Sequence, residues 1–157
     1  ELKAIGATGV IMAEPAAGLL SNEDCQEYST VYVRRIVEAV QDDDFVVILH
    51  NCGNKGQCTQ AMIDSGAAAL HFGNAVDMVE ALEQCPSDLV VMGNIDPVGI
   101  LKQATSEEVY RITADLLLKT SQYKNFVISS GCDMPPLVPE ANIKAFYKAV
   151  ADFNGVK

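Results

Sequence analysis

Two residue types that bind transition metals stand together at the end of an apolar run. In "VVILHNCGN", residues 46–54, aliphatic residues lead directly into His50 and Cys52. A third such residue, Cys132, follows another apolar run in "VISSGCDMPP". Imidazole and thiolate ligands favour zinc over magnesium or calcium, which prefer oxygen. Catalytic zinc usually has three protein ligands and one open position, so these three residues predict a site of that kind.

A plainer interpretation of the same residues stays open at this point. The H-x-C-G pattern is short enough to arise by chance, and a free cysteine is often a small buried hydrophobe. His50 could equally donate a hydrogen bond to a backbone carbonyl. All three residues stand at the ends of predicted strands, however, and functional residues of parallel α/β folds gather at the carboxyl ends of strands. Their position therefore favours the metal.

Two acidic residues also follow predicted strands and are candidates for a catalytic role. Glu14 precedes "PAAGLLS" and could bind a substrate, orient a metal ligand or cap a loop. Asp96 precedes Pro97, a pair that also predicts a helix N-cap with proline at the first helical position. His71 lies inside a short apolar run, which predicts a core histidine with its hydrogen bonds satisfied. The remaining cysteines fall in or beside helical patterns and predict packing roles; they are Cys25, Cys58 and Cys85.

The elements that must position these residues alternate along the chain. Five continuous apolar runs have the composition of strands covered by helices on a parallel sheet. These predicted strands are residues 8–14, 45–50, 68–73, 89–94 and 125–131. Capping signals between and after the strands predict helix starts. They are Ser21 with Asp24, Asn54, Asn74, Asp96 with Pro97, Thr105 with Glu108, and Pro139 with Glu140.

This alternation predicts parallel βαβ units in a single α/β domain over residues 1–157. An open doubly wound sheet and part of a (β/α)8 TIM barrel both fit the pattern. No G-x-G-x-x-G or Walker motif follows any predicted strand, which disfavours a nucleotide-binding sheet. Five units are fewer than a complete barrel of about 250 residues contains. Because the first residues have the pattern of a helix end, we expect a partial TIM barrel, about the last five βα units of a larger one.

Composition and charge indicate which partners and which cellular compartment to expect. Hydrophobic residues make up 49% of the 157 residues and the formal net charge is −10, which describes an acidic globular protein. Negative charge repels phosphate backbones and anionic lipids, so neither nucleic acid nor a membrane is an expected partner. No apolar run is long enough to span a bilayer. Five irregularly spaced cysteines predict reduced thiols in a cytoplasmic protein. Exposed edges of a partial sheet predict association into a homo-oligomer through those edges.

Several longer motifs resemble one enzyme superfamily. They are "HNCGN" after an apolar strand, "VMGNIDPVGIL" followed by "TSEEV", and "VISSGCDMPPLVPEANIKAF". Together they resemble the uroporphyrinogen decarboxylase superfamily, and more narrowly its corrinoid-linked branch of methylcobamide:coenzyme M-type methyltransferases. The segment "EPAAGLLSNEDCQEYSTVYVRRI" is similar to an earlier part of the same barrel. The resemblance covers nearly the whole chain in the same order, and it implies the last five βα units.

The resemblance also implies a reaction and its site. Methyltransferases of this branch bind one Zn²⁺ through residues that match His50, Cys52 and Cys132 here. The zinc holds a small thiol such as coenzyme M, and the sulfur takes a methyl group from a methylcobamide on a separate corrinoid protein. Some relatives place an acidic residue after the next strand, where this chain has Gly73 and Asn74. The fourth ligand would then come from Glu14 or from solvent.

Two alternatives to the methyltransferase remain. The first is an enzyme of porphyrin biosynthesis of the uroporphyrinogen decarboxylase type. Such decarboxylases use no metal and typically lack the H-x-C pair at this strand. The second alternative is an inactive half-barrel that needs a partner half, because the mouth of a barrel is built from eight loops. The H-x-C pair of His50 and Cys52 is the reason to favour the methyltransferase.

Overall fold

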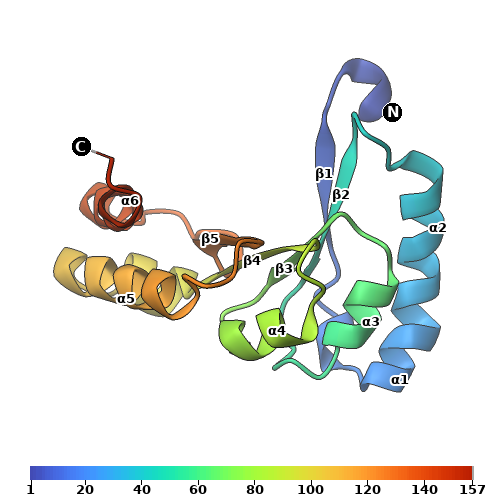
Figure 1. Ribbon diagram of the computed structural model, residues 1–157, viewed down its shortest axis with the longest axis horizontal. Coiled ribbons are helices and arrows are strands. Elements are labelled where there is room, and N and C mark those ends of the chain that lie inside the picture. The colour runs from blue at the N-terminus through green and yellow to red at the C-terminus, as the bar shows by residue number, and fades with distance from the viewer. Residues whose placement is uncertain (157) are drawn as a thin grey trace.

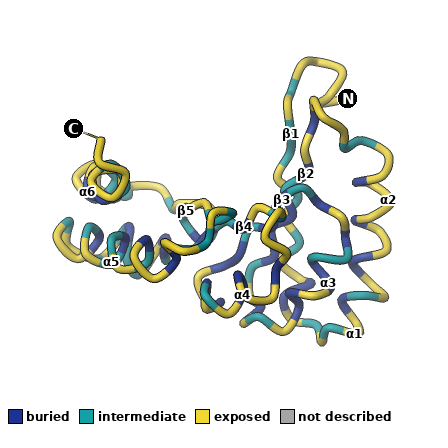
Figure 2. Tube along the Cα trace, in the orientation of Figure 1, coloured by how far each residue is buried: buried dark blue, intermediate teal, exposed yellow. Residues whose placement is uncertain are grey.

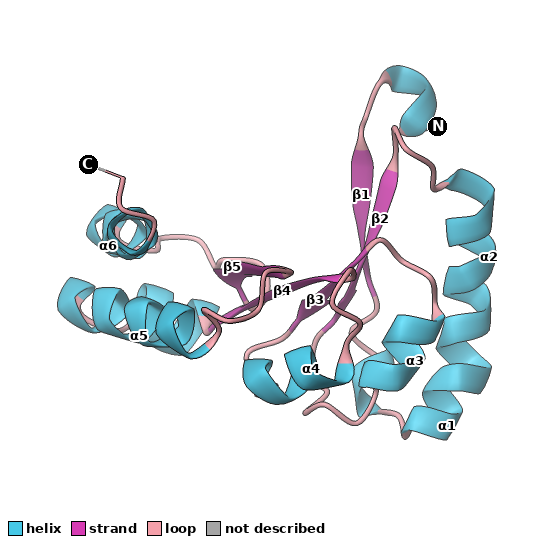
Figure 3. Ribbon diagram, viewed as in Figure 1, coloured by secondary structure: helices cyan, strands magenta, loops and turns pink. Residues whose placement is uncertain are grey.

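A computed structural model describes residues 1–156 of the chain, and its strands and helices alternate (Figures 1 and 3). The strands are β1 (Gly9–Ala13), β2 (Val46–Asn51), β3 (Ala69–Phe72), β4 (Val90–Ile95) and β5 (Phe126–Ser130). The α-helices are α1 (Asn22–Cys25), α2 (Val31–Val40), α3 (Thr59–Asp64), α4 (Met78–Gln84), α5 (Ser106–Lys119) and α6 (Glu140–Phe153). Short 3-10 helices span Lys3–Ile5 and Ala17–Leu19, and π-helical segments span Gln26–Thr30 and Pro97–Lys102.

The five strands form one parallel sheet in the order β1-β2-β3-β4-β5. Every observed strand begins and ends within one residue of its predicted bounds, so the strand predictions are confirmed. Figure 1 shows a strongly curved sheet with β1 and β5 at its two ends. Each strand is next to its sequence neighbour, which is the order found in a barrel rather than in a doubly wound sheet.

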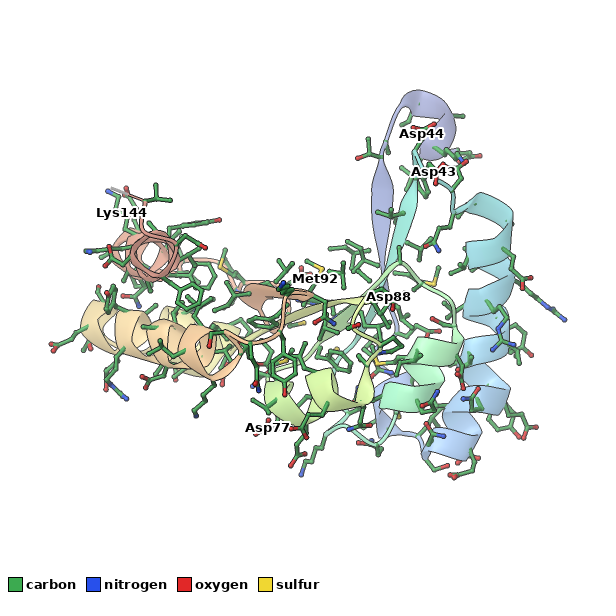
Figure 4. All side chains as sticks on the ribbon, in the orientation of Figure 1. Asp43, Asp44, Asp77, Asp88, Met92 and Lys144 are labelled. Carbon is green, nitrogen blue, oxygen red and sulfur yellow. The ribbon has the colours of Figure 1, made fainter. Side chains whose placement is uncertain are left out.

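The two faces of the sheet have different surroundings. Leu49, Leu70 and Val91 lie side by side in the strand register and are buried in the main core with residues of α2, α3 and α4. These helices lie together on one side of the sheet (Figure 1). On the opposite face Ile11 is 58% exposed, and Met92 lies on the side of the sheet away from α4 (Figure 4). Burial on the helical face therefore holds this layer together.

A second buried cluster joins the last helices to the sheet. It contains Ile95 at the end of β4, Leu101, Val109 of α5 and Ala145 of α6. Both helices carry buried residues three or four positions apart, which places them on one side of each helix; the buried stretches of α5 are visible in Figure 2. Since α5 and α6 flank β5 in the chain, this cluster fixes the strand whose carboxyl end leads to Cys132.

The helix starts were predicted correctly where a side chain caps its own first turn. The Ser21 side chain accepts a hydrogen bond from the Asp24 amide, and the helical segment that follows continues to Val40. Asp96 caps Pro97–Lys102 through bonds from the Val98 and Gly99 amides. Such bonds satisfy amides that have no partner within the helix.

Two predicted helix starts were wrong. Helix α3 begins at Thr59, not after Asn54, and α4 begins at Met78 with Asp77 as its cap, not after Asn74. The Asn54 side chain is buried and bonds within its loop, where it donates to Asn51 and accepts from the Gly56 amide. Asparagine side chains stabilise turns as readily as helix starts, and the Asn54 side chain stabilises a turn.

Replacing Thr105 with alanine is expected to lower the free energy of unfolding by about 1 kcal/mol. Thr105 and Glu108 form a reciprocal capping box at the start of α5, so the substitution leaves the Glu108 amide without its partner. Urea unfolding followed by circular dichroism measures the loss. An unchanged unfolding midpoint would contradict this role for the capping box.

Among residues 1–156, no helix combines the length and the apolar character that crossing a membrane requires.

Candidate metal centre

His50, Cys52 and Cys132 come together at the carboxyl end of the sheet. Their ligand atoms, one imidazole nitrogen and two sulfurs, all lie within 4.8 Å of one another. His50 belongs to β2, Cys52 follows it directly, and Cys132 lies two residues beyond β5. The three line a hollow of about 680 Å³ on the face of the sheet opposite helices α2 to α4. Residues far apart in the sequence thus form one group of soft ligands.

One nitrogen of His50 has no hydrogen-bond partner among the described residues. His50 is 5% exposed, and its Nε2 atom is buried and unpaired. Its Nδ1 atom lies 3.1 Å from the carbonyl oxygen of His71, so Nδ1 carries the proton and Nε2 has a free lone pair. Buried polar atoms are nearly always paired, and a metal ion would satisfy this one. The donor set therefore fits a bound zinc ion.

The two cysteines are half-buried and close enough to influence each other. Burial raises the pKa of the Cys52 thiol, and the neighbouring Cys132 raises it further. Two thiolates at this distance repel each other, and a divalent cation removes that repulsion when it displaces the protons. The electrostatics of the metal-free group therefore also favour a cation between the sulfurs.

His71 lies next to the group, although the sequence predicts only a satisfied core histidine. Both of its ring nitrogens do have partners: Nδ1 is 2.8 Å from His50 Nδ1, and Nε2 is 2.8 Å from the Ser130 carbonyl oxygen. Burial lowers the pKa of its imidazole. The pairing of His50 with His71 across β2 and β3 explains their contact. A single sequence does not give this register, so the sequence gives no sign that His71 lies beside the ligands.

Glu14 and Asp96 lie near the same end of the sheet but outside the group of ligands. The Glu14 carboxylate accepts a hydrogen bond from the Ser29 hydroxyl, while its backbone amide bonds to the carbonyl of His50. The Asp96 carboxylate accepts from the two amides of its helix cap. Neither carboxylate lines the hollow beside His50. Their catalytic roles stay predictions, and for Asp96 the observed contacts are those of a cap.

A close backbone approach holds the loop that carries Cys52. Gly18 packs against this loop so tightly that a Cβ atom there would overlap the carbonyl oxygen of Cys52. The same Cβ would also lie 2.8 Å from Asn51 Oδ1 and from the Asn54 amide nitrogen. A side chain at position 18 would therefore have to displace the backbone next to a candidate ligand.

The Gly18→Ala variant is expected to be about 1–3 kcal/mol less stable, because overpacking forces the neighbouring backbone to shift. It is also expected to bind zinc more weakly, since Cys52 moves with that backbone. Thermal unfolding and zinc titration measure the two effects. Ala16→Ser, at an exposed position two residues earlier, serves as the control. Equal stability of both variants would contradict the close approach at Gly18.

The fold and this group define a class: a parallel (β/α) barrel segment with a group of candidate metal ligands at the carboxyl ends of its strands. The chain belongs to the uroporphyrinogen decarboxylase (URO-D) family, whose model matches residues 2–153. The family resemblance seen in the sequence is thereby confirmed. A solved methyltransferase from Methanosarcina mazei superposes with a TM-score of 0.84 at 21% identity, covering 98% of this chain and 44% of that one. The predicted partial barrel is thus confirmed as well.

Curated relatives include two kinds of enzyme. The methylcobamide:CoM methyltransferase MtbA of Methanosarcina acetivorans is 27% identical over 150 residues, which cover 94% of this chain and 43% of the relative. The uroporphyrinogen decarboxylase of Prochlorococcus marinus (strain NATL1A) is 29% identical over 151 residues, covering 95% and 42%. The chain therefore spans about two fifths of the length of the curated relatives it matches. Identity alone does not separate the two kinds.

Proposed function

We propose that this chain is the metal-binding part of a zinc-dependent methyltransferase, which moves a methyl group from a methylated corrinoid protein to a small thiol. The relatives named as methylcobamide:CoM methyltransferases support the reaction class. The barrel-type sheet supports placing the site at the carboxyl ends of the strands. A complete barrel mouth is expected to be needed for the full reaction.

The unpaired Nε2 atom of His50 carries this proposal. It is buried and has a free lone pair, and His50 belongs with Cys52 and Cys132 to a group whose ligand atoms lie within 4.8 Å of one another. A buried histidine whose only role is packing would be expected to pair both nitrogens. His50 instead leaves this nitrogen unpaired in a close group with two cysteines, a donor set that suits a soft divalent cation.

Each residue then has a definite role. His50, Cys52 and Cys132 would hold the ion, and the hollow of about 680 Å³ beside them leaves room for a small thiol. When bound, zinc lowers the pKa of a coordinating thiol while leaving its sulfur nucleophilic. The apolar side chains of Ile11 and Met92 line the same hollow and would limit the access of water to the sulfur. The corrinoid carries the reactive methyl group, so the protein supplies binding and orientation.

Zinc analysis under reducing conditions is the first test. We expect one zinc ion per chain, and uptake of a small thiol such as coenzyme M by the zinc-loaded protein but not by the metal-free protein. Transfer of a methyl group from a methylated cobamide to that thiol tests the reaction itself. The absence of stoichiometric zinc would refute the proposal. Metal-independent consumption of uroporphyrinogen would favour a decarboxylase instead.

A further inference from the structure

We propose that His71 is a positioning residue for the metal centre, because it keeps the proton of His50 on Nδ1 and its Nε2 free for the ion. This inference rests on the proposed function and deepens it. His71 itself donates no atom to the group of His50, Cys52 and Cys132.

The proton positions follow from the partners of the two rings. A carbonyl oxygen only accepts, so the 2.8 Å contact between His71 Nε2 and the Ser130 oxygen requires a proton on that Nε2. In a neutral imidazole the other nitrogen is then an acceptor, so His71 Nδ1 has a free lone pair. It lies 2.8 Å from His50 Nδ1, which supplies the proton for this contact.

A second, independent contact leads to the same assignment. His50 Nδ1 also lies 3.1 Å from the backbone oxygen of His71, and this oxygen too can only accept. The Nδ1 atom and the backbone oxygen of His71 are thus both acceptors for the Nδ1 proton of His50. With that proton in place, the lone pair of His50 lies on Nε2, the buried nitrogen that has no partner, and this is the nitrogen left to bind an ion beside Cys52 and Cys132. Metal-binding histidines commonly have their other ring nitrogen fixed in this way.

The sheet makes this arrangement rigid. His50 and His71 are register partners on neighbouring parallel strands, and their ring centroids are 4.6 Å apart with a tilt of 46°. At its far side the His71 ring contacts the hydroxyl of Ser129, at 2.9 Å, and the carbonyl of Ser130. Ser130 ends β5 two residues before Cys132. His71 therefore connects the strand that carries one ligand to the strand that leads to another.

Zinc affinity of the whole chain, measured by competition with a chromophoric chelator, tests the role of this ring. His71→Phe removes the acceptor and is expected to weaken zinc binding by about 10–100-fold. The backbone acceptor remains, which places the expected loss toward the lower end. His71→Asn can return an acceptor oxygen near the former Nδ1 position and is expected to recover most of the affinity. Val90→Ala, at the exposed first position of β4 and outside the hollow, should bind as the wild type does.

Nitrogen-15 spectra of the metal-free protein give a readout that packing alone would not change. We expect the Nδ1–H tautomer of His50 to dominate in the wild type and its share to fall in His71→Phe, which keeps only the backbone oxygen as an acceptor. Wild-type zinc affinity in His71→Phe, equal losses in the Phe and Asn variants, or a proton on His50 Nε2 would each overturn the positioning role. Failure of the wild type to bind zinc would instead refute the proposed function, so the two failures are distinguishable.

Discussion

Replacing Cys132 with serine is expected to lower zinc affinity by more than about 100-fold, a larger loss than removal of a group behind a ligand usually causes. The variant keeps His50 and Cys52 but loses the sulfur of the third candidate ligand, which follows β5. A hydroxyl at this position is a poor ligand for a soft ion. Equilibrium dialysis with metal analysis, under reducing conditions, measures the loss.

Cys85→Ser is the matched control for this experiment. Cys85 is buried at the end of α4, outside the candidate group, and burial raises the pKa of its thiol to about 11. It therefore stays protonated at neutral pH and should contribute nothing to metal binding. Zinc binding by Cys132→Ser as tight as that of the wild type and of Cys85→Ser would show that Cys132 is not a ligand. Loss of zinc in both variants would point to a general disturbance of the fold.

Replacing Phe72 with alanine is expected to reduce the free energy of unfolding by about 3–5 kcal/mol. Phe72 is completely buried at the end of β3, on the helical face of the sheet. Removing the ring takes apolar surface out of the core and leaves a cavity that the neighbouring side chains fill only in part. Single domains are stable by about 5–15 kcal/mol, so this loss is a large fraction of the total.

Ile11→Ala provides the comparison on the other face. Ile11 is apolar too, but it is 58% exposed on β1, and its truncation is expected to cost about 0.5 kcal/mol or less. Denaturant unfolding of both variants measures the difference. Similar losses for Phe72→Ala and Ile11→Ala would contradict the assignment of the core to the helical face.

The strands were predictable because their signal is local. A short apolar run such as residues 45–49, rich in β-branched and aliphatic residues, is typical of a covered strand, and β2 lies within one residue of the prediction over 45–50. Helix starts were harder, because Asn54 and Asn74 carry the same local signal as a true cap. The surrounding loop distinguishes Asn54 from a true cap. There its buried side chain donates a hydrogen bond to Asn51 and accepts one from the Gly56 amide.

In the candidate site too, some features were predictable from the local sequence and others depended on the tertiary structure. Residue type and strand-end position were enough to select His50, Cys52 and Cys132 as candidate ligands. The same reasoning also selected Glu14 and Asp96, and their hydrogen bonds to Ser29 and to a helix cap appear only in the structure. Position at a strand end is shared by functional residues and by ordinary caps, so it does not separate them.

The sequence by itself determined the alternation of strands and helices, the parallel sheet and the ligand types, because propensity, capping and side-chain chemistry act over a few residues. Only the tertiary structure decided that Cys132 lies beside His50 and Cys52, and that His71 faces His50. Both contacts depend on strand order and register, since β2 and β3 set the two rings side by side. These relations arise from burial of the whole helical face, which no short segment encodes.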